Sequence, residues 1–316
     1  MPEKDFQTKG YRMVEVKNPD GTVTMKNMWD VEAKYYSLMT LMEVNGTNKQ
    51  LDAIPLKPDD VVLDCGCGPG RVAIQAAKRV KKVICLDASE GMLEECKKNC
   101  AAAGVENVEF VLADWQLTEI GNTIPEVDVI IQSRGGGGPS TFEMLEKAAR
   151  RIAVNIMWAK GAPNLPMSRG KLFKDVYSEE AMEQYPELKP FDKRPRPPMP
   201  PKGDKGGPGR GPGGLFHDLY AELDKRGIER HVTTIDEGWD KWYATKEEAY
   251  DDLICLSRHP ECVEPVQFRK NVDQFLTEKD GETCLKTSNA GIEDSYSIMY
   301  ADFELEAGQA IGFDYL

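Results

Sequence analysis

The 316-residue chain has few of the side chains that metal sites and acid–base catalysis most often use. It contains three histidines, and the Cys65-x-Cys67 pair has no matching second pair or histidine cluster to complete a metal site. No run of 18 or more apolar residues is present, and the first residues lack the apolar centre of a secretion signal. We therefore expect no metal site and no membrane-spanning helix, and we interpret Cys65 and Cys67 as small filling residues.

Positive charge is also scarce. The chain has 40 Lys and Arg against 53 Asp and Glu, a formal net charge of −13. Tight binding of nucleic acid without sequence preference needs a basic surface, so the charge argues against a nucleic-acid partner, although RNA contacted through a local patch stays open. Several of the eight cysteines fall in expected strands or on helix faces, which is typical of reduced thiols and favours a cytoplasmic location. The sequence indicates no oligomeric state.

The most informative segment is a short apolar run that breaks into glycines. The run over 61–63 ends at Asp64, and Gly66, Gly68 and Gly70 follow at alternate positions before an expected helix over 71–80. Glycine lets the backbone approach a ligand where a Cβ atom would block it, and a helix N-terminus favours polar or anionic groups. This arrangement predicts a nucleotide-type cofactor site.

Strands and helices alternate along the chain as a parallel sheet requires. Five strands are expected at 61–63, 83–86, 108–112, 127–131 and 152–157, with helices at 71–80, 89–103 and 141–151. Two further strands are expected near 229–235 and 295–304. Right-handed crossovers then give an α/β fold with a doubly wound, mostly parallel sheet of seven strands.

The chain divides into four expected segments. Residues 1–50 form an N-terminal helical lid around an amphipathic helix at 30–43, and 51–160 form the cofactor-binding half of the α/β core. Residues 161–214 form an insertion after the fifth strand, rich in Pro and Gly and unsuited to regular helix or central strand. Residues 215–316 complete the core and the acceptor side.

The residues of the loop are compatible with two cofactor classes. Gly68-x-Gly70-x-x-Ala73, followed at a suitable distance by Asp87, matches a dinucleotide fingerprint. Asp64 argues against it, because a carboxylate there would lie near the pyrophosphate but would suit a cofactor ammonium group. Asp114 and Trp115 follow the third strand, at the sheet edge where ligands of open α/β sheets bind.

Three motifs in order, over residues 64–70, 86–89 and 112–115, resemble those of class I S-adenosylmethionine-dependent methyltransferases. The resemblance covers residues 28–157 best and implies S-adenosylmethionine as cofactor and S-adenosylhomocysteine as product. It implies that the three glycines contact the methionine portion, that Asp87 accepts from the ribose hydroxyls and that Asp114 accepts from the adenine amino group. The full implied set is Asp64, Gly66, Cys67, Gly68, Gly70, Asp87, Ala88, Met92, Asp114, Trp115, Gln132 and Tyr36.

The residues that would bind or activate the methyl acceptor are less clearly indicated by the sequence. The segment 131–139 lacks the Asn/Asp-Pro-Pro-aromatic motif by which many amino-methylating nucleic-acid enzymes resemble one another, which favours a small-molecule acceptor. Arg134 would bind a substrate anion or be a solvated loop residue, and His217 and His231 are the candidate bases. No catalytic residue is assigned. The alternatives are an NAD(P)-dependent oxidoreductase and a non-catalytic sensor or scaffold that binds S-adenosylmethionine.

Overall fold

The computed structural model describes residues 13–17, 22–134, 142–156, 169–185, 188–189, 224–225, 227, 232–234, 240–257, 259–279, 282–286 and 297–302. Its centre is a parallel sheet in the order β5-β4-β3-β6-β7. The strands are β3 (Val61–Cys65), β4 (Lys82–Asp87), β5 (Val108–Leu112), β6 (Val127–Ser133) and β7 (Ala149–Ile156). The predicted parallel α/β core is confirmed.

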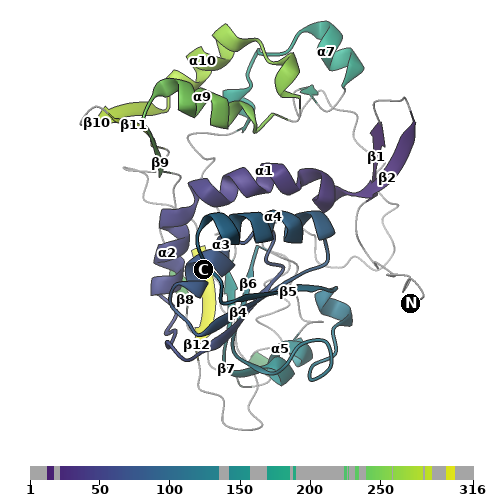
Figure 1. Cartoon of the computed structure of the whole chain (residues 1–316), viewed down its shortest axis with the longest axis vertical. Helices are drawn as coiled ribbons and strands as arrows, with labels where there is room; N and C mark the ends of the chain where they lie inside the picture. The colour runs from purple at the N-terminus through teal and green to yellow at the C-terminus, as the bar shows by residue number, and fades with distance from the viewer. Residues whose placement is uncertain are drawn as a thin grey trace.

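Helices cover both faces of this sheet (Figure 1). On one face, α2 (Val44–Asp52), α3 (Arg71–Ala77) and α4 (Glu90–Ala102) enclose an apolar cluster with strand residues such as Val62 and Val129. On the other face, α5 (Phe142–Ala148) and the short 3-10 helix η1 (Trp115–Leu117) cover Leu63 and Ile130. Burial on both faces explains why the central strands are almost continuously apolar.

The helix ends expected from the sequence agree with the structure in one case and differ from it in another. The helix expected over 89–103 is present as α4, where Ser89 is the N-cap and its hydroxyl accepts from Met92 N–H at 3.1 Å. The helix expected over 141–151 is wrong at its end, because α5 stops at Ala148 and β7 begins at Ala149. Ala149 pairs with Val127 of β6, so sheet pairing prevails there over helix propensity.

Beyond β7 the strands run antiparallel. β12 (Ser297–Asp302) pairs with β7, and β8 (Val232–Thr234) pairs with β12. These two elements fall within the strands expected at 295–304 and 229–235. The order β3, β4, β5 on one side and β6, β7 on the other reverses direction between β3 and β6, which makes their carboxyl ends the topological switch point.

A second layer packs on α1 (Met28–Met42), which lies alongside α4 (Figure 1). Met42 of α1 is buried with Leu253 and Phe268 in a separate apolar cluster. The layer contains α6 (Arg169–Leu172), α7 (Glu179–Gln184), β9 (Asp240–Tyr243), α9 (Lys246–Ile254), η5 (Pro260–Cys262), α10 (Pro265–Asp273), β10 (Leu276–Lys279) and β11 (Glu282–Lys286). Its three strands form an antiparallel sheet in the order β10-β11-β9, which was not predicted.

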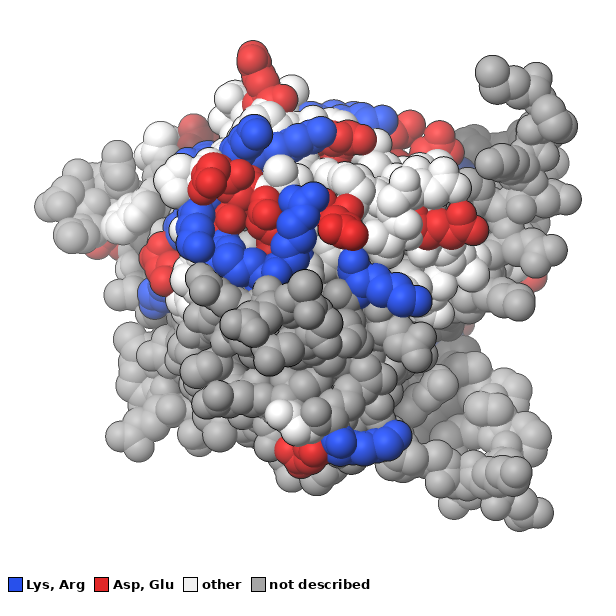
Figure 2. Space-filling model, turned by 90° about the horizontal axis from the view of Figure 1, so that it is seen from below, with Lys and Arg blue, Asp and Glu red and all other residues white. Residues whose placement is uncertain are grey.

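At the N-terminal side, β1 (Met13–Lys17) and β2 (Val23–Asn27) form an antiparallel hairpin that leads into α1. None of the described helices combines the length and apolar character needed to cross a bilayer. On the face seen in Figure 2, Lys and Arg side chains are interspersed with Asp and Glu side chains over the described residues. The described part of that face therefore offers no broad basic surface.

Candidate functional site

The glycine loop joins β3 to α3 in a conformation that side chains disfavour. Gly66, Gly68 and Gly70 have φ values of 73°, 52° and 93°, all in the left-handed region. The N–H groups of Gly66 and Cys67 both donate to the carbonyl of Leu86, at 2.8 and 3.0 Å. These bonds tie the loop to β4 and hold it over the carboxyl edge of the sheet.

Gly70 is a loop position where a side chain would be poorly tolerated. A Cβ atom there would lie 2.8 Å from Cys96 Sγ, in addition to the positive φ. We expect Gly70→Ala to lower the free energy of unfolding by about 2–3 kcal/mol, from backbone strain and overpacking together. Gly104→Ala is the matched control, because Gly104 has φ +66° and open space around its Cβ position.

Urea unfolding of both variants measures the difference. Gly104→Ala is expected to lose about 1–2 kcal/mol from strain alone. Equal losses in the two variants would show that contact with Cys96 contributes nothing.

Asp64 is a buried carboxylate directly beneath the loop. Its side chain is 1% exposed, it interacts with the N–H of Ala73, and its Oδ2 atom has no hydrogen-bond partner. Burial raises the pKa of Asp64 from 3.8 to about 7, while the positive charge of Arg71 lowers it. An unpartnered buried acceptor at this place fits a cationic ligand group, because such a group would favour the ionised form.

Asp87 connects the loop to the turn that follows β4. Oδ2 accepts from Gly68 N–H and Oδ1 accepts from Ser89 N–H, both at 2.8 Å. Burial raises the pKa of Asp87, and these backbone hydrogen bonds lower it. A carboxylate offers about four acceptor positions, so Asp87 retains capacity for a ligand hydroxyl. Ala88, next in the chain, is half-buried.

The other residues expected around the purine lie on the same edge. Met92 is buried, and its sulfur lies 4.0 Å from the position of a Cβ on Gly68. Asp114 is buried at the end of β5, and its Oδ1 accepts from Gln116 N–H at 2.9 Å. Trp115 is buried in the opposite apolar cluster, and its indole N–H has no hydrogen-bond partner.

Cys65 and Cys67 do not face one another. Cys65 belongs to the cluster under α5, and Cys67 belongs to the cluster under α3 and α4. Both thiols are buried and free, and burial raises the pKa of each. Within the described residues, no group of three or more His, Cys, Asp or Glu is arranged to hold a metal ion. This arrangement agrees with a filling role for both residues.

Gln132 and Asn155 form a polar pair that sequence reasoning found only in part. Gln132 pairs in register with Cys65 on one side and with Asn155 on the other, so the three side chains share a sheet face. Both amides are 2% exposed, and both carbonyl oxygens lack a hydrogen-bond partner. Asn155 was missed, although an Asn within the apolar run that ends β7 was an available signal.

Helix α1 is held against α4 by two side-chain contacts. Asp30 Oδ1 accepts from the hydroxyl of Ser89 and from Gly91 N–H. Ser37 exchanges hydrogen bonds with Asn99, whose amide donates to Pro69 O at 3.0 Å. Tyr36, one of the residues implied to bind the cofactor, is 36% exposed on α1. The helix therefore connects to both the glycine loop and the turn after β4.

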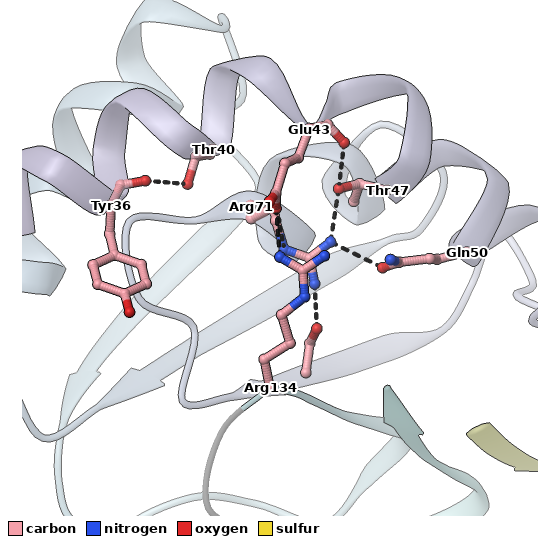
Figure 3. Close-up of polar contacts among 8 residues, drawn as sticks. Tyr36, Thr40, Glu43, Thr47, Gln50, Arg71 and Arg134 are labelled. Atoms are coloured by element: carbon pink, nitrogen blue, oxygen red, sulfur yellow. Dashed lines mark hydrogen bonds and ion pairs between the residues drawn. The ribbon is translucent and has the colours of Figure 1, made fainter. Parts of the chain in front are cut away.

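Arg134 lies at the end of β6, beside two further charged groups (Figure 3). Arg134 Nη1 contacts Glu43 Oε2 at 2.6 Å, and Arg71 Nε lies 3.5 Å from the same oxygen. Glu43 comes from the junction of α1 and α2, and Arg71 begins α3. Sequence reasoning found Arg134 alone. His217 and His231 lie outside the described residues.

The described residues suit an adenosyl amino-acid cofactor. Beneath a glycine loop that excludes Cβ atoms lie an unpartnered buried carboxylate oxygen on Asp64 and a carboxylate on Asp87 that holds the loop. Unpartnered acceptors on Gln132 and Asn155 lie on the adjacent strands. This donor and acceptor set favours a ligand that carries an ammonium group and hydroxyls over one that carries a pyrophosphate at the loop.

Residues 62–135, which include the glycine loop and all three carboxylates, match the family described as "Methyltransferase domain". Curated relatives align over short stretches. A 23S rRNA (uracil(1939)-C(5))-methyltransferase of Xanthomonas campestris is 32% identical over 92 residues, 27% of this chain and 20% of that protein. A probable cobalt-precorrin-6B C(15)-methyltransferase of Methanocaldococcus jannaschii is 39% identical over 56 residues, 18% of this chain and 31% of that protein.

The chain thus spans a fifth to a third of the length of these relatives. Among solved structures, the YcgJ protein of Bacillus subtilis is 14% identical, with a TM-score of 0.41, and the alignment covers 83% of this chain and 99% of that one.

Proposed function

Because the chain belongs to the class I S-adenosylmethionine-dependent methyltransferase family, we propose that it transfers a methyl group from S-adenosylmethionine to a small-molecule acceptor, leaving S-adenosylhomocysteine. The observation that carries this proposal is Asp64, a buried carboxylate with an unpartnered oxygen inside the matched segment. The family match also favours this function over an NAD(P)-dependent oxidoreductase.

In this proposal the chain binds and orients, and the cofactor supplies an electrophilic methyl group on a sulfonium. Asp64 holds the ammonium group, Asp87 accepts from a ribose hydroxyl and Asp114 accepts from the adenine amino group. Gly66, Gly68 and Gly70 let the backbone approach the methionine portion. Alignment of a nucleophile with a bound methyl group contributes on the order of 7–11 kcal/mol to lowering a barrier. The lack of an assigned base therefore does not count against the proposal.

Four expectations about architecture stay part of the proposal. Helix α1, with Tyr36, lids the cofactor together with the rest of 1–50. The strands β12 and β8 complete a seven-stranded sheet around the cofactor-binding half, residues 51–160. Residues 161–214 form an insertion over the site, and 215–316 contribute the acceptor side. The hydrogen bonds between Asp30 and Ser89 and between Asn99 and Ser37 support a lid role for α1, because they hold this helix over the turn that follows β4.

The small-molecule acceptor is supported by the net charge of −13, which opposes phosphate attraction. One relative is named as an rRNA methyltransferase, so RNA is the competing acceptor. The deciding experiment incubates the protein and labelled S-adenosylmethionine with a metabolite extract and, separately, with total RNA. A label that enters only RNA would contradict the small-molecule proposal.

Calorimetry tests the cofactor before any acceptor is known. We expect micromolar binding of S-adenosylhomocysteine and no binding of NAD. The reverse result would refute the proposal, and binding without turnover across both acceptor pools would indicate a sensor or scaffold.

A further inference from the structure

The first turn of helix α4 is held by a carboxylate that comes from another helix. Asp30, in the first turn of α1, accepts through Oδ1 from the hydroxyl of Ser89 and, at 3.1 Å, from the N–H of Gly91. The two helices lie alongside one another (Figure 1). Because Ser89 is the N-cap of α4, Asp30 fixes the beginning of this helix from a position 59 residues earlier in the chain.

Ser89 connects Asp30 to Asp87, the carboxylate proposed to hold the ribose. The N–H of Ser89 donates to Asp87 Oδ1 at 2.8 Å, and its hydroxyl accepts from the N–H of Met92 at 3.1 Å. A hydroxyl has one proton and an ionised carboxylate only accepts, so that proton points to Asp30 and a lone pair is left for Met92. Ser89 is 1% exposed, so bulk water does not reach it to replace Asp30. Asp30 thus fixes the direction of the Ser89 hydroxyl, and with it the turn that holds Asp87.

Two carboxylates of like charge interact in this arrangement. Burial raises the pKa of Asp87 and the negative charge of Asp30 raises it further, while hydrogen bonds from backbone N–H groups lower it. The N-terminus of α4, a helix of 13 residues, offsets part of the repulsion, because it favours negative charge. Ser89 already caps α4, so the cap alone does not require a second carboxylate here. The arrangement therefore indicates that Asp30 serves the turn at Asp87.

Gly91 lets α1 come close enough to form these bonds. A Cβ atom on Gly91 would lie 2.9 Å from Asp30 Cα and 3.2 Å from the carbonyl oxygen of Asp30, both of which are backbone atoms. Glycine is otherwise unfavourable within a helix, so the close approach of α1 explains its presence in the first turn of α4. The position of Asp30 is therefore set by contact between two backbones.

We propose that Asp30 is a positioning residue for the cofactor. When α1 is docked on Gly91, Asp30 acts through Ser89 to hold Asp87 in the orientation that receives the ribose hydroxyls. This inference rests on the proposed function, and it gives the lid helix a part in recognising the ribose. Coupling between two parts of a protein is reciprocal, so a bound ribose also holds α1 in its docked position.

Two nucleosides that differ only in their ribose hydroxyls test this role. Isothermal calorimetry measures the binding of adenosine and of 2′,3′-dideoxyadenosine to wild type, Asp30→Ala and Asp30→Asn. We expect Asp30→Ala to weaken adenosine binding by about tenfold, within the usual range of coupling between sites, and to change dideoxyadenosine binding by less than about twofold. Asp30→Asn keeps the accepting oxygen and should retain most of the preference for adenosine. Equal weakening of both nucleosides, or equal losses in the two variants, would overturn the proposal.

A double-mutant cycle tests whether Asp30 acts through Asp87. S-adenosylhomocysteine is titrated into wild type, Asp30→Ala, Asp87→Ala and the double variant. If Asp30 acts through Asp87, the double variant binds no more weakly than Asp87→Ala, because the two losses are not additive. Losses that multiply would overturn this inference and leave the proposed function in place. Absence of binding to wild type would refute the proposed function, and this inference with it.

Gly91→Ala is a second variant, and it leaves the Asp30 side chain unchanged. The added methyl group displaces α1 from the first turn of α4, whereas alanine favours α4 itself. A weaker α4 therefore cannot explain an effect of this variant. We expect Gly91→Ala to lose the preference for adenosine as Asp30→Ala does, and a wild-type preference would overturn the proposal.

Glu264→Ala is the matched control for the loss of a helix-capping carboxylate. Glu264 is exposed at the beginning of α10, where it accepts from the N–H groups of Val266 and Gln267 at 3.0 and 2.6 Å. We expect this variant to keep the wild-type preference for adenosine. A loss of preference equal to that of Asp30→Ala would show a general effect of removing a helix cap, and would overturn the proposal.

Discussion

Replacing Asp87 with alanine is expected to weaken S-adenosylhomocysteine binding by ~2–4 kcal/mol, about 30- to 1000-fold, because buried hydroxyls would lose a charged acceptor. Isothermal calorimetry of wild type and Asp87→Ala measures the loss. The same carboxylate also accepts from Gly68 and Ser89 N–H, so the variant disturbs the loop as well as the ligand contact. The measurement must therefore separate these two effects.

Two ligands that differ only in their ribose hydroxyls can separate the loss of the ligand contact from the disturbance of the loop. Wild type should prefer adenosine to 2′,3′-dideoxyadenosine, and Asp87→Ala should lose that preference if the carboxylate holds the ribose. An unchanged preference, with both affinities reduced, would mean that Asp87 acts through the loop alone. Asp59→Ala is the control, because Asp59 is an exposed carboxylate just before β3 and should bind like wild type.

The second large effect concerns pH. Burial raises the pKa of Asp64 to about 7, so the free protein holds a proton there below neutrality. An ammonium group favours the carboxylate, so binding releases that proton. We expect the affinity for S-adenosylhomocysteine to rise about tenfold per pH unit well below pH 7, roughly 50-fold from pH 5 to pH 7, and to level off about 100-fold above its pH 5 value.

The pKa of Asp64 has the opposite consequence for stability. A carboxyl whose pKa is raised in the folded state binds its proton more tightly there than in the unfolded chain. Its contribution to stability therefore falls as pH rises from 3.8 to about 7, and the full penalty remains above that range. Asp64→Asn should lose the pH dependence of binding and bind weakly, yet unfold at a higher temperature than wild type at pH 8.

Calorimetry across this pH range, in buffers of different ionisation enthalpy, measures the released proton directly. Thermal unfolding without ligand measures the stability effect. A steep pH dependence that persists in Asp64→Asn would assign the titration to another group. Asp59→Asn should retain the wild-type profile.

The sequence predicted the structure best where a pattern among neighbouring residues also matches what the packed fold needs at that place. Val62 and Leu63 face opposite apolar clusters, so an apolar run was the expected pattern for β3. The three glycines all have positive φ, and Ser89 caps α4. Such features depend on neighbours in sequence, and so the parallel core and the loop could be predicted.

The ion-pair cluster at the end of β6 could not be found in this way. Glu43 and Arg71 have ordinary sequence surroundings, and only the folded chain brings them to Arg134. The strands β9, β10 and β11 are equally hard to predict. They have four or five residues each, too few for a clear alternation, and β9 pairs with β11, which lies far away in the chain.

Because of the two hydrogen bonds of Asp87, amide hydrogen exchange can report the opening of the glycine loop. The amide protons of Gly68 and Ser89 are held by the two oxygens of a single carboxylate, although they belong to different turns. Any opening that frees the carboxylate exposes both protons at once. Their exchange rates should therefore change together when a ligand binds, and the pair would report the closure of both turns in a single spectrum.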